Sequence, residues 1–265
     1  MMEALINYAA RSDDRMRYFA NDSSRDTILI EPRPMRIEDA RDSTPRLDRE
    51  GFALVEHRSA VADFADGEVV LALHRDEIAR LIVALTGADH VAVPGGGVLR
   101  FAERSSLSGA LDNSRPARFA HVDISDVTAA QFSERSAPPG RRVRRSAHFN
   151  VWRAISAPPQ DVPLALCDAR SFAAADLLPA DAIFDQAGKP EWSFEGLVFA
   201  HRSGHRWHWF SGLDRDHAIV FKTHDSDPGQ PHCVPHVAFD NPDCPVDVPP
   251  RASIEMRAIA YWFED

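Results

Sequence analysis

Cysteine, lysine and long apolar runs are all scarce in this sequence of 265 residues. The cysteines Cys167, Cys233 and Cys244 are an odd number without CxxC spacing, so neither a disulfide framework nor a cysteine zinc site is predicted. We expect the thiols to be reduced. Lysine occurs only at Lys189 and Lys222, and arginine supplies nearly all of the positive charge.

No apolar run approaches the length needed to cross a membrane. Residues 1–15 also lack the order of basic and then apolar residues that marks a signal peptide. We therefore expect a soluble, cytoplasmic protein with no membrane partner. The net charge of −10 argues against general nucleic-acid binding, which requires a positive surface.

The remaining composition is that of an ordinary globular protein, with 44% hydrophobic residues, and the length suits one all-β domain covering residues 1–265. Residues 1–50 are polar and interrupted by prolines, which predicts an extended, partly helical N-terminal arm packed on the body rather than a core element. Between residues 68 and 86, apolar residues recur three and four positions apart. This spacing predicts an amphipathic helix, and Gly87 is expected to end it.

Short apolar runs separated by turn residues predict strands in the rest of the chain. One strand, 51–57, precedes the helix, and the others cover 90–93, 97–101, 117–123, 147–155, 164–167, 195–199, 206–210, 218–223, 236–239 and 252–263. Many short strands with one good helix predict a mainly β protein, an antiparallel sandwich or barrel.

A histidine and an aspartate two positions apart, His121 and Asp123, are the first candidate metal ligands. Side chains alternate between the two faces of a strand, so both point to the same side and can bind one ion. The same H-x-D pattern at His74 and Asp76 lies in the predicted helix, where residues two apart diverge by about 200°. That copy cannot chelate, and the spacing of His121 and Asp123 alone fits a surface pair without metal equally well.

The third ligand is expected to be a histidine far downstream. His236 opens the apolar run 237–239, which favours a rigid position, whereas the alternative His232 lies in a proline-rich loop and His224 stands beside Asp225. Two imidazoles and one carboxylate on one side of a metal, with open positions opposite, are typical of non-haem Fe(II) oxygenases.

Arginine is the residue best suited to bind the distal carboxylate of a cosubstrate such as 2-oxoglutarate, because its fork bonds bidentately. Arg251 opens the last predicted strand and shares one face with Ser253, so the two are candidates to bind that carboxylate together. Arg257, further along the same face, is the alternative. An amphipathic strand with these residues facing outward would show the same pattern.

Four further polar residues are candidates for the pocket. Asn150 shares a strand face with Trp152 and is a candidate hydrogen-bond donor to the cosubstrate, while Arg153 lies on the opposite face. Arg100, Lys222, Arg153 and Arg257 are candidate substrate-binding residues, although an isolated lysine on a strand is usually solvated.

Several of these motifs occur in the order found in a known family. The sequence resembles the AsaB-type hydroxylase/desaturase family of mostly fungal secondary metabolism, with its CmcJ-like and gibberellin desaturase-like members. The resemblance rests on GFALV (51–55), TGA (86–88), AHVD (120–123), FNVWR (149–153), PLALCD (163–168), HRW (205–207), FK (221–222), PHVAF (235–239) and RASIEMR (251–257).

This resemblance implies a double-stranded β-helix, or jelly roll, with flanking N-terminal helices. It implies an Fe(II)/2-oxoglutarate-dependent oxygenase that uses O2 to hydroxylate or desaturate a small molecule by hydrogen abstraction. His121, Asp123 and His236 would be the iron ligands, and Arg251 with Ser253 resembles the R-x-S carboxylate clamp of related oxygenases. Residues 93–100 depart from the family pattern, so the resemblance does not extend to the pocket wall there or to the substrate.

Two other functions fit the same residues. An iron oxidase that takes its electrons from the substrate would need no 2-oxoglutarate, and a catalytically silent jelly-roll protein would bind metal beside a partner enzyme. Neither the identity of the small-molecule substrate nor the presence of a homodimer follows from the sequence.

Overall fold

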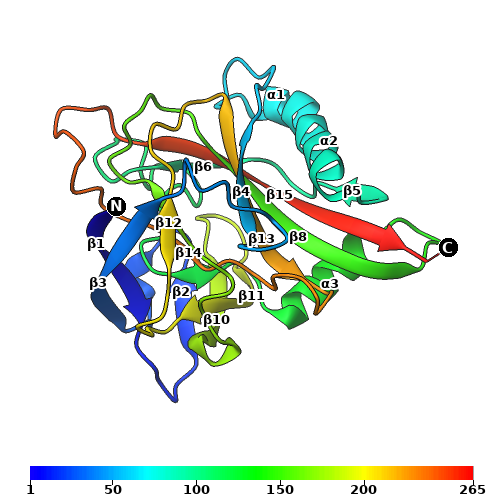
Figure 1. The fold of residues 1–265 in the computed structure, drawn as a ribbon, viewed down its shortest axis with the longest axis horizontal. Coiled ribbons are helices and arrows are strands. Elements are labelled where there is room, and N and C mark those ends of the chain that lie inside the picture. Colours follow the sequence, from blue (N-terminus) through cyan, green and yellow to red (C-terminus); the bar gives the residue numbers. More distant parts are fainter. Residues whose placement is uncertain (265) are drawn as a thin grey trace.

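Two β-sheets that face each other form the body of the molecule in the computed structural model, which describes residues 1–264 (Figure 1). The larger sheet has nine strands, in the spatial order β1 (Met2–Ala9), β3 (Ile30–Asp39), β12 (Trp207–Trp209), β9 (Leu164–Cys167), β14 (His236–Ala238), β7 (His121–Val122), β11 (Trp192–Phe199), β10 (Leu177–Phe184) and β2 (Met16–Phe19).

The second sheet has six strands and carries the longest antiparallel pair of the fold. Its order is β4 (Phe52–Glu56), β13 (His217–Asp225), β8 (Val143–Ala154), β15 (Ala252–Phe263) and β5 (His90–Ala92), with β6 (Val98–Phe101) also paired to β15. Buried side chains from both sheets, including Trp152 and Phe221 on one and Leu164 and Leu166 on the other, pack in one cluster between them. This arrangement confirms the predicted jelly roll.

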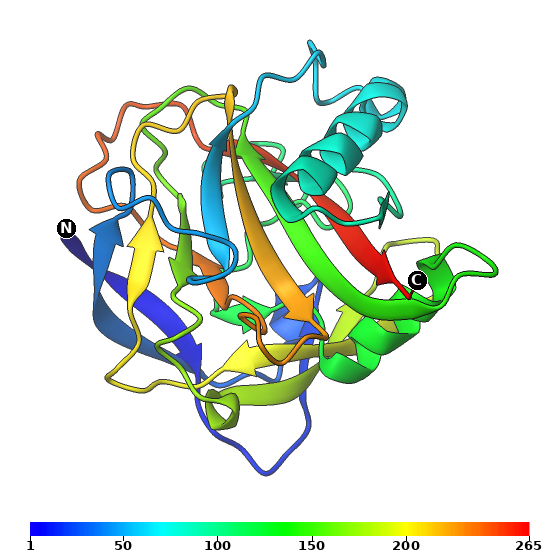
Figure 2. The ribbon, with the colours of Figure 1, turned by 45° about the vertical axis from the view of Figure 1, so that its right-hand side comes forward.

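Helical residues between 67 and 86 cover the outer face of the six-stranded sheet (Figure 2). One helical stretch runs through α1 (Gly67–Val69), the π-helix η2 (Val70–His74) and α2 (Arg75–Thr86), and ends at Gly87 with a φ of 64°. A further helix, α3 (Asp126–Ser136), starts behind Ser125, whose side chain accepts a hydrogen bond from the Thr128 amide. The short 3-10 helices are η1 (Ser23–Arg25) and η3 (Ala174–Asp176). Within residues 1–264, no helix is long and apolar enough to span a membrane.

The alternation of side chains along β15 decides which of its residues face the interior between the sheets. Ile254, Met256 and Ala258 pack under the helices in one apolar cluster. Ser253, Glu255 and Arg257, which alternate with them along the strand, therefore point to the opposite face, toward the nine-stranded sheet.

The prediction of an N-terminal arm outside the core was wrong. Strands β1, β2 and β3 all belong to the nine-stranded sheet, and Ile6 and Tyr8 are fully buried. The prolines that suggested an irregular arm, Pro32 and Pro34, pair with β1, whereas β12 joins β3 only from Ile37 onward. At these prolines β3 has one neighbour, so the missing amide hydrogens cost no ladder hydrogen bond on the open side.

Two other segments differ from the prediction. Residues 177–184 form β10, which was not predicted, and it pairs with β11 on one side and β2 on the other. The strand predicted over 117–123 is reduced to His121–Val122.

Candidate metal centre

Direct strand pairing brings His121 and His236 together from positions far apart in the sequence. The two residues are register partners where β7 meets β14, and their rings lie 4.3 Å apart between centroids. Asp123 follows β7 on the same face. Its Oδ1 lies 3.4 Å from Nε2 of His121 and 3.5 Å from Nε2 of His236, and all three side chains are buried.

The hydrogen bonds on the far side of each ring orient both imidazoles toward one point. Nδ1 of His121 lies 3.0 Å from the Phe119 carbonyl oxygen, and Nδ1 of His236 lies 3.1 Å from that of Val234. A carbonyl only accepts, so Nδ1 is the donor and Nε2 of each neutral ring presents a lone pair. Burial and the neighbouring His236 lower the pKa of His121, which favours the neutral ring.

Three electron-pair donors, two Nε2 atoms and the Asp123 Oδ1, therefore converge within 4.8 Å of one another. Such atoms repel unless a cation lies among them. Two imidazoles and a carboxylate suit a divalent transition metal such as Fe(II), and the donor set fits that ion on chemical grounds.

The second carboxylate oxygen of Asp123 is occupied by two donors from the opposite sheet. Oδ2 accepts from Nδ2 of Asn150 at 2.9 Å and lies 3.1 Å from Nη2 of Arg257. Asn150 and Arg257 are register partners across β8 and β15, which places both side chains over Asp123. Burial by itself would raise the pKa of Asp123. Arg257 and the two histidines nevertheless hold this pKa well below its usual value.

Arg251 lines a small cavity together with the residues of the three donors. This cavity, of about 30 Å³, is lined by His121, Asp123, His236, Arg251, Trp152, Glu255 and neighbouring residues. Nη1 of Arg251 donates to Oγ of Ser253, whereas the buried Nε has no hydrogen-bond partner within residues 1–264. Burial and the nearby Arg100 lower the pKa of Arg251 to about 10, so the side chain stays cationic at neutral pH.

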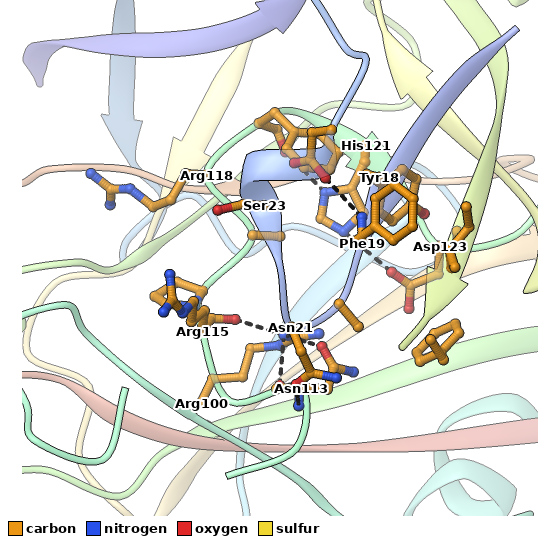
Figure 3. A pocket seen from close by; sticks show the side chains of 18 of the residues that line it. Tyr18, Phe19, Asn21, Ser23, Arg100, Asn113, Arg115, Arg118, His121 and Asp123 are labelled. Atoms are coloured by element: carbon orange, nitrogen blue, oxygen red, sulfur yellow. Dashed lines mark hydrogen bonds and ion pairs between the residues drawn. The ribbon is translucent and has the colours of Figure 1, made fainter. Parts of the chain in front are cut away.

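A larger cavity of about 400 Å³ opens on His121 and Asp123 from the side of β2 (Figure 3). Sequence reasoning missed most of its lining, including Tyr18, Phe19, Asn21, Asn113, Arg115 and Phe119. The residues contributed by β2 and the turn after it could not be found, because residues 1–50 were interpreted as an arm outside the core.

Arg100 lies in the wall of this larger cavity and fixes one of its loops. Its Nη1 donates to the backbone carbonyls of Asn113 and Arg115 and to the Asn113 side chain, at 2.7–3.0 Å. Asn21 in turn accepts from the Asn113 amide, which joins the turn after β2 to the same loop.

A third cavity, of about 300 Å³, is also lined by Asp123. Asp123 and Arg257 line both this cavity and the larger one, and Asn150, His148 and Trp192 line this one. Pro94 and Gly95, from the stretch that departs from the family pattern, form part of its wall. Two residues of the stretch to which the resemblance does not extend therefore line a cavity that Asp123 also lines.

Two predicted binding residues lie elsewhere. Lys222 is buried in a network with Asp225, 2.7 Å from its Oδ2, and lines a separate hollow with Arg145 and Trp262. Arg153 points to the other face of β8, where its guanidinium donates to the His57 carbonyl oxygen. The structure does not bring either side chain to the three converging donors.

The remaining histidine candidates are also placed away from this point. His74 lies in the helical stretch and its Nδ1 contacts Glu77 at 2.8 Å, so it is not paired with Asp76. His232 and His224 lie together beside Asp126.

Comparisons with known proteins show the family of this chain. A family model described as "Oxidoreductase/YMDC permease-like domain" matches residues 6–261. The hydroxylase/desaturase CTB9 of Cercospora beticola is 30% identical over 257 residues, which cover 88% of this chain and 77% of that protein. The chain belongs to this hydroxylase/desaturase family. The predicted AsaB-type resemblance is confirmed, since the hydroxylase/desaturase asaB of Aspergillus flavus is 35% identical over 132 residues, 46% of this chain and 57% of its own.

A solved structure shares the same fold. The iron and alpha-ketoglutarate-dependent endoperoxidase NvfI superposes with a TM-score of 0.84 at 23% identity, covering 99% of this chain and 98% of its own. In sequence, the Fe(II)/2-oxoglutarate-dependent dioxygenase nvfI of Aspergillus novofumigatus is 27% identical over 250 residues, 87% of this chain and 84% of its own.

Proposed function

We propose that this protein is a non-haem Fe(II)/2-oxoglutarate-dependent dioxygenase that hydroxylates or desaturates a small molecule. Family membership supports the reaction class, because named relatives are Fe(II)/2-oxoglutarate-dependent dioxygenases and hydroxylase/desaturases. We assign His121, Asp123 and His236 as the iron ligands. The observation that carries this assignment is the convergence of three lone-pair donors on one buried point.

Iron bound there would couple the activation of O2 to the decarboxylation of 2-oxoglutarate. It would thereby supply the oxidant that removes hydrogen from the substrate. The protein's own contribution is to hold the ligands, bind the two organic molecules and exclude water.

Arg251 and Ser253 are assigned as the clamp for the distal carboxylate of 2-oxoglutarate. Arg251 is buried, cationic and has an unpartnered Nε within residues 1–264, so a bound carboxylate would satisfy both its charge and its donor. The cavity of about 30 Å³ that Arg251 lines is small, so it holds only part of a ligand. The rest of the cosubstrate would lie toward the larger cavity, with which this one shares His121, Asp123 and Arg100.

Asn150 and Arg257 are assigned to positioning Asp123 rather than to direct binding of the cosubstrate. Both donors occupy Oδ2, which leaves Oδ1 as the single carboxylate oxygen directed at the metal. A one-oxygen ligand keeps more of the coordination sphere open for cosubstrate and O2 than a two-oxygen ligand would. The substrate itself is assigned to the cavity of about 400 Å³.

Formation of succinate tests the proposal without knowledge of the substrate. Metal-stripped protein is reconstituted with Fe(II) and ascorbate and incubated with 2-oxoglutarate in air, and succinate is measured over time. The wild type is expected to produce succinate slowly in the absence of substrate, and the His121→Ala and His236→Ala variants are not. Oxygen uptake during turnover of a substrate, without formation of succinate, would favour an oxidase instead. Tight metal binding without any turnover would favour a binding protein.

A further inference from the structure

A second cluster of metal-binding side chains lies outside the proposed iron centre. Asp126, His224 and His232 each offer one ligand atom within 4.8 Å of the others. Oδ1 of Asp126 lies 2.8 Å from Nε2 of His232 and 3.7 Å from Nε2 of His224, so both rings direct the same nitrogen to one oxygen.

The three side chains come from three separate elements, each held in place by its own contacts. Asp126 is the first residue of α3, directly after the capping Ser125. His224 stands on the long strand β13, and His232 on the loop that leads to β14. The loop is tied back to β13, since the Val234 amide donates to the Lys222 carbonyl.

His224 is the member that an ion pair alone does not explain. It is only 9% exposed, and its Nδ1 has no hydrogen-bond partner within residues 1–264. Its Nε2 is 3.7 Å from Asp126, beyond the length of a hydrogen bond. The largely buried ring thus has no hydrogen bond to Nδ1 and only a long contact at Nε2, where a metal would give it a strong partner.

We propose that Asp126, His224 and His232 form a second divalent transition-metal site, distinct from the iron centre. Two imidazole nitrogens and one carboxylate oxygen favour Zn²⁺ or a similar ion over Ca²⁺ or Mg²⁺, which prefer all-oxygen sites. Asp126 and His232 are exposed, so water completes the coordination.

The position of this second site gives it a structural role. Asp126 is three residues after Asp123, and His232 is four residues before His236. Val234, between His232 and His236, accepts the hydrogen bond that orients the His236 ring. A metal here joins the two segments that carry iron ligands, so its binding stabilises their arrangement from the outside.

The test uses a His121→Ala/His236→Ala double variant, which removes the two imidazoles of the iron centre but retains Asp123 with its partner Arg257. After metal stripping, this variant is titrated with Co²⁺, followed by its visible absorption, and with Zn²⁺ by calorimetry. One equivalent of either metal is expected to bind, and Zn²⁺ is expected to raise the Tm.

Further substitution of His232 by Ala in this background should abolish both effects, and Asp126→Asn should weaken binding at least tenfold. Since His232 and Asp126 are exposed, neither change is expected to prevent folding. The matched control is His90→Ala, which removes an exposed histidine of β5 and should leave binding unchanged. No bound metal in the double variant, or equal binding after His232→Ala, would overturn the proposal. Because the readout is metal binding in a protein that lacks both imidazoles of the iron centre, the result is independent of the oxygenase assignment.

Discussion

Arg257 on β15 pairs with Asp123, 3.1 Å from its Oδ2, and so joins the six-stranded sheet to the residue that follows β7 in the nine-stranded sheet. The guanidinium also lies 3.3 Å from Glu255 through its Nε. Arg257 and Asp123 together line two cavities. Arg251, the other arginine that the sequence predicted as a candidate for the cosubstrate carboxylate, lines the small cavity instead.

The two H-x-D pairs of the chain provide a matched test of the metal ligands. Asp123→Ala is expected to abolish the weak visible charge-transfer band that forms when Fe(II) and 2-oxoglutarate are added without oxygen, because it removes the carboxylate of the three-ligand set. Asp76→Ala removes the aspartate of the helical copy, which is exposed, and should retain the full band. A normal band in Asp123→Ala would disprove the ligand assignment.

Loosening Asp123 should weaken iron binding without removing a ligand. Asn150→Ala and Arg257→Met each delete one donor to Oδ2, and loss of such an outer contact typically reduces metal affinity about 10- to 100-fold. Fe(II) affinity is measured by anaerobic competition with a chromophoric chelator. We expect the double variant to lose less than the product of the single effects, because both donors act on the same oxygen. Unchanged affinity in both single variants would show that Asp123 is held by other means.

Arg251→Gln should raise the KM for 2-oxoglutarate more than it lowers kcat. The loss of a hydrogen bond to a charged group costs about 1.5–3 kcal/mol, which is roughly a 10- to 100-fold rise in KM. Ser253→Ala should give a smaller rise in the same direction. Steady-state succinate formation at varied 2-oxoglutarate measures both constants, with Arg144→Gln on the exposed part of β8 as the control. An unchanged KM in Arg251→Gln at unchanged Tm would transfer the clamp role to another cation.

The Lys222 network should determine stability rather than activity. The Asp225 carboxylate accepts hydrogen bonds from Nζ of Lys222 and from two nitrogens of Arg145. Asp225→Asn therefore leaves two cations without their buried counter-charge. We expect a loss of about 3–5 kcal/mol in the free energy of unfolding, measured in urea, with the KM for 2-oxoglutarate unchanged. Asp216→Asn breaks the exposed pair with Arg58 and should cost at most about 1 kcal/mol.

The same carboxylate gives this stability a defined pH dependence. Burial by itself would raise the pKa of Asp225, but hydrogen bonds from Arg145 and Lys222 lower this pKa overall. A group with a lowered folded-state pKa stabilises the fold above its usual pKa, and this contribution is lost as the pH falls through the lowered value. The difference in unfolding free energy between wild type and Asp225→Asn should therefore be constant near neutral pH and shrink in acid. A difference that grew on acidification would contradict the assignment of the charge.

Local pattern was sufficient to predict several features of this molecule. Alternation along β15 put Arg251, Ser253 and Arg257 on one face, and the three-and-four spacing of residues 68–86 gave the helix that ends at Gly87. These features depend on neighbours within a few residues, where strand and helix periods fix the direction of each side chain. The ordered motifs likewise identified the family, the jelly roll and the Fe(II)/2-oxoglutarate-dependent reaction class, all of which were confirmed.

Only the tertiary structure decided which distant segments meet. The prolines of β3 look like those of an irregular arm, and nothing local reveals that Pro32 and Pro34 stand where the strand has a single neighbour. The sequence made Lys222 a candidate substrate-binding residue, whereas in the structure it is buried against Asp225. The pairing of β7 with β14 depends on sheet order, and it brings His121 next to His236. The cluster of Asp126 with His232 depends on sheet order as well. Sheet order is set by long-range packing, and no short stretch of sequence encodes it.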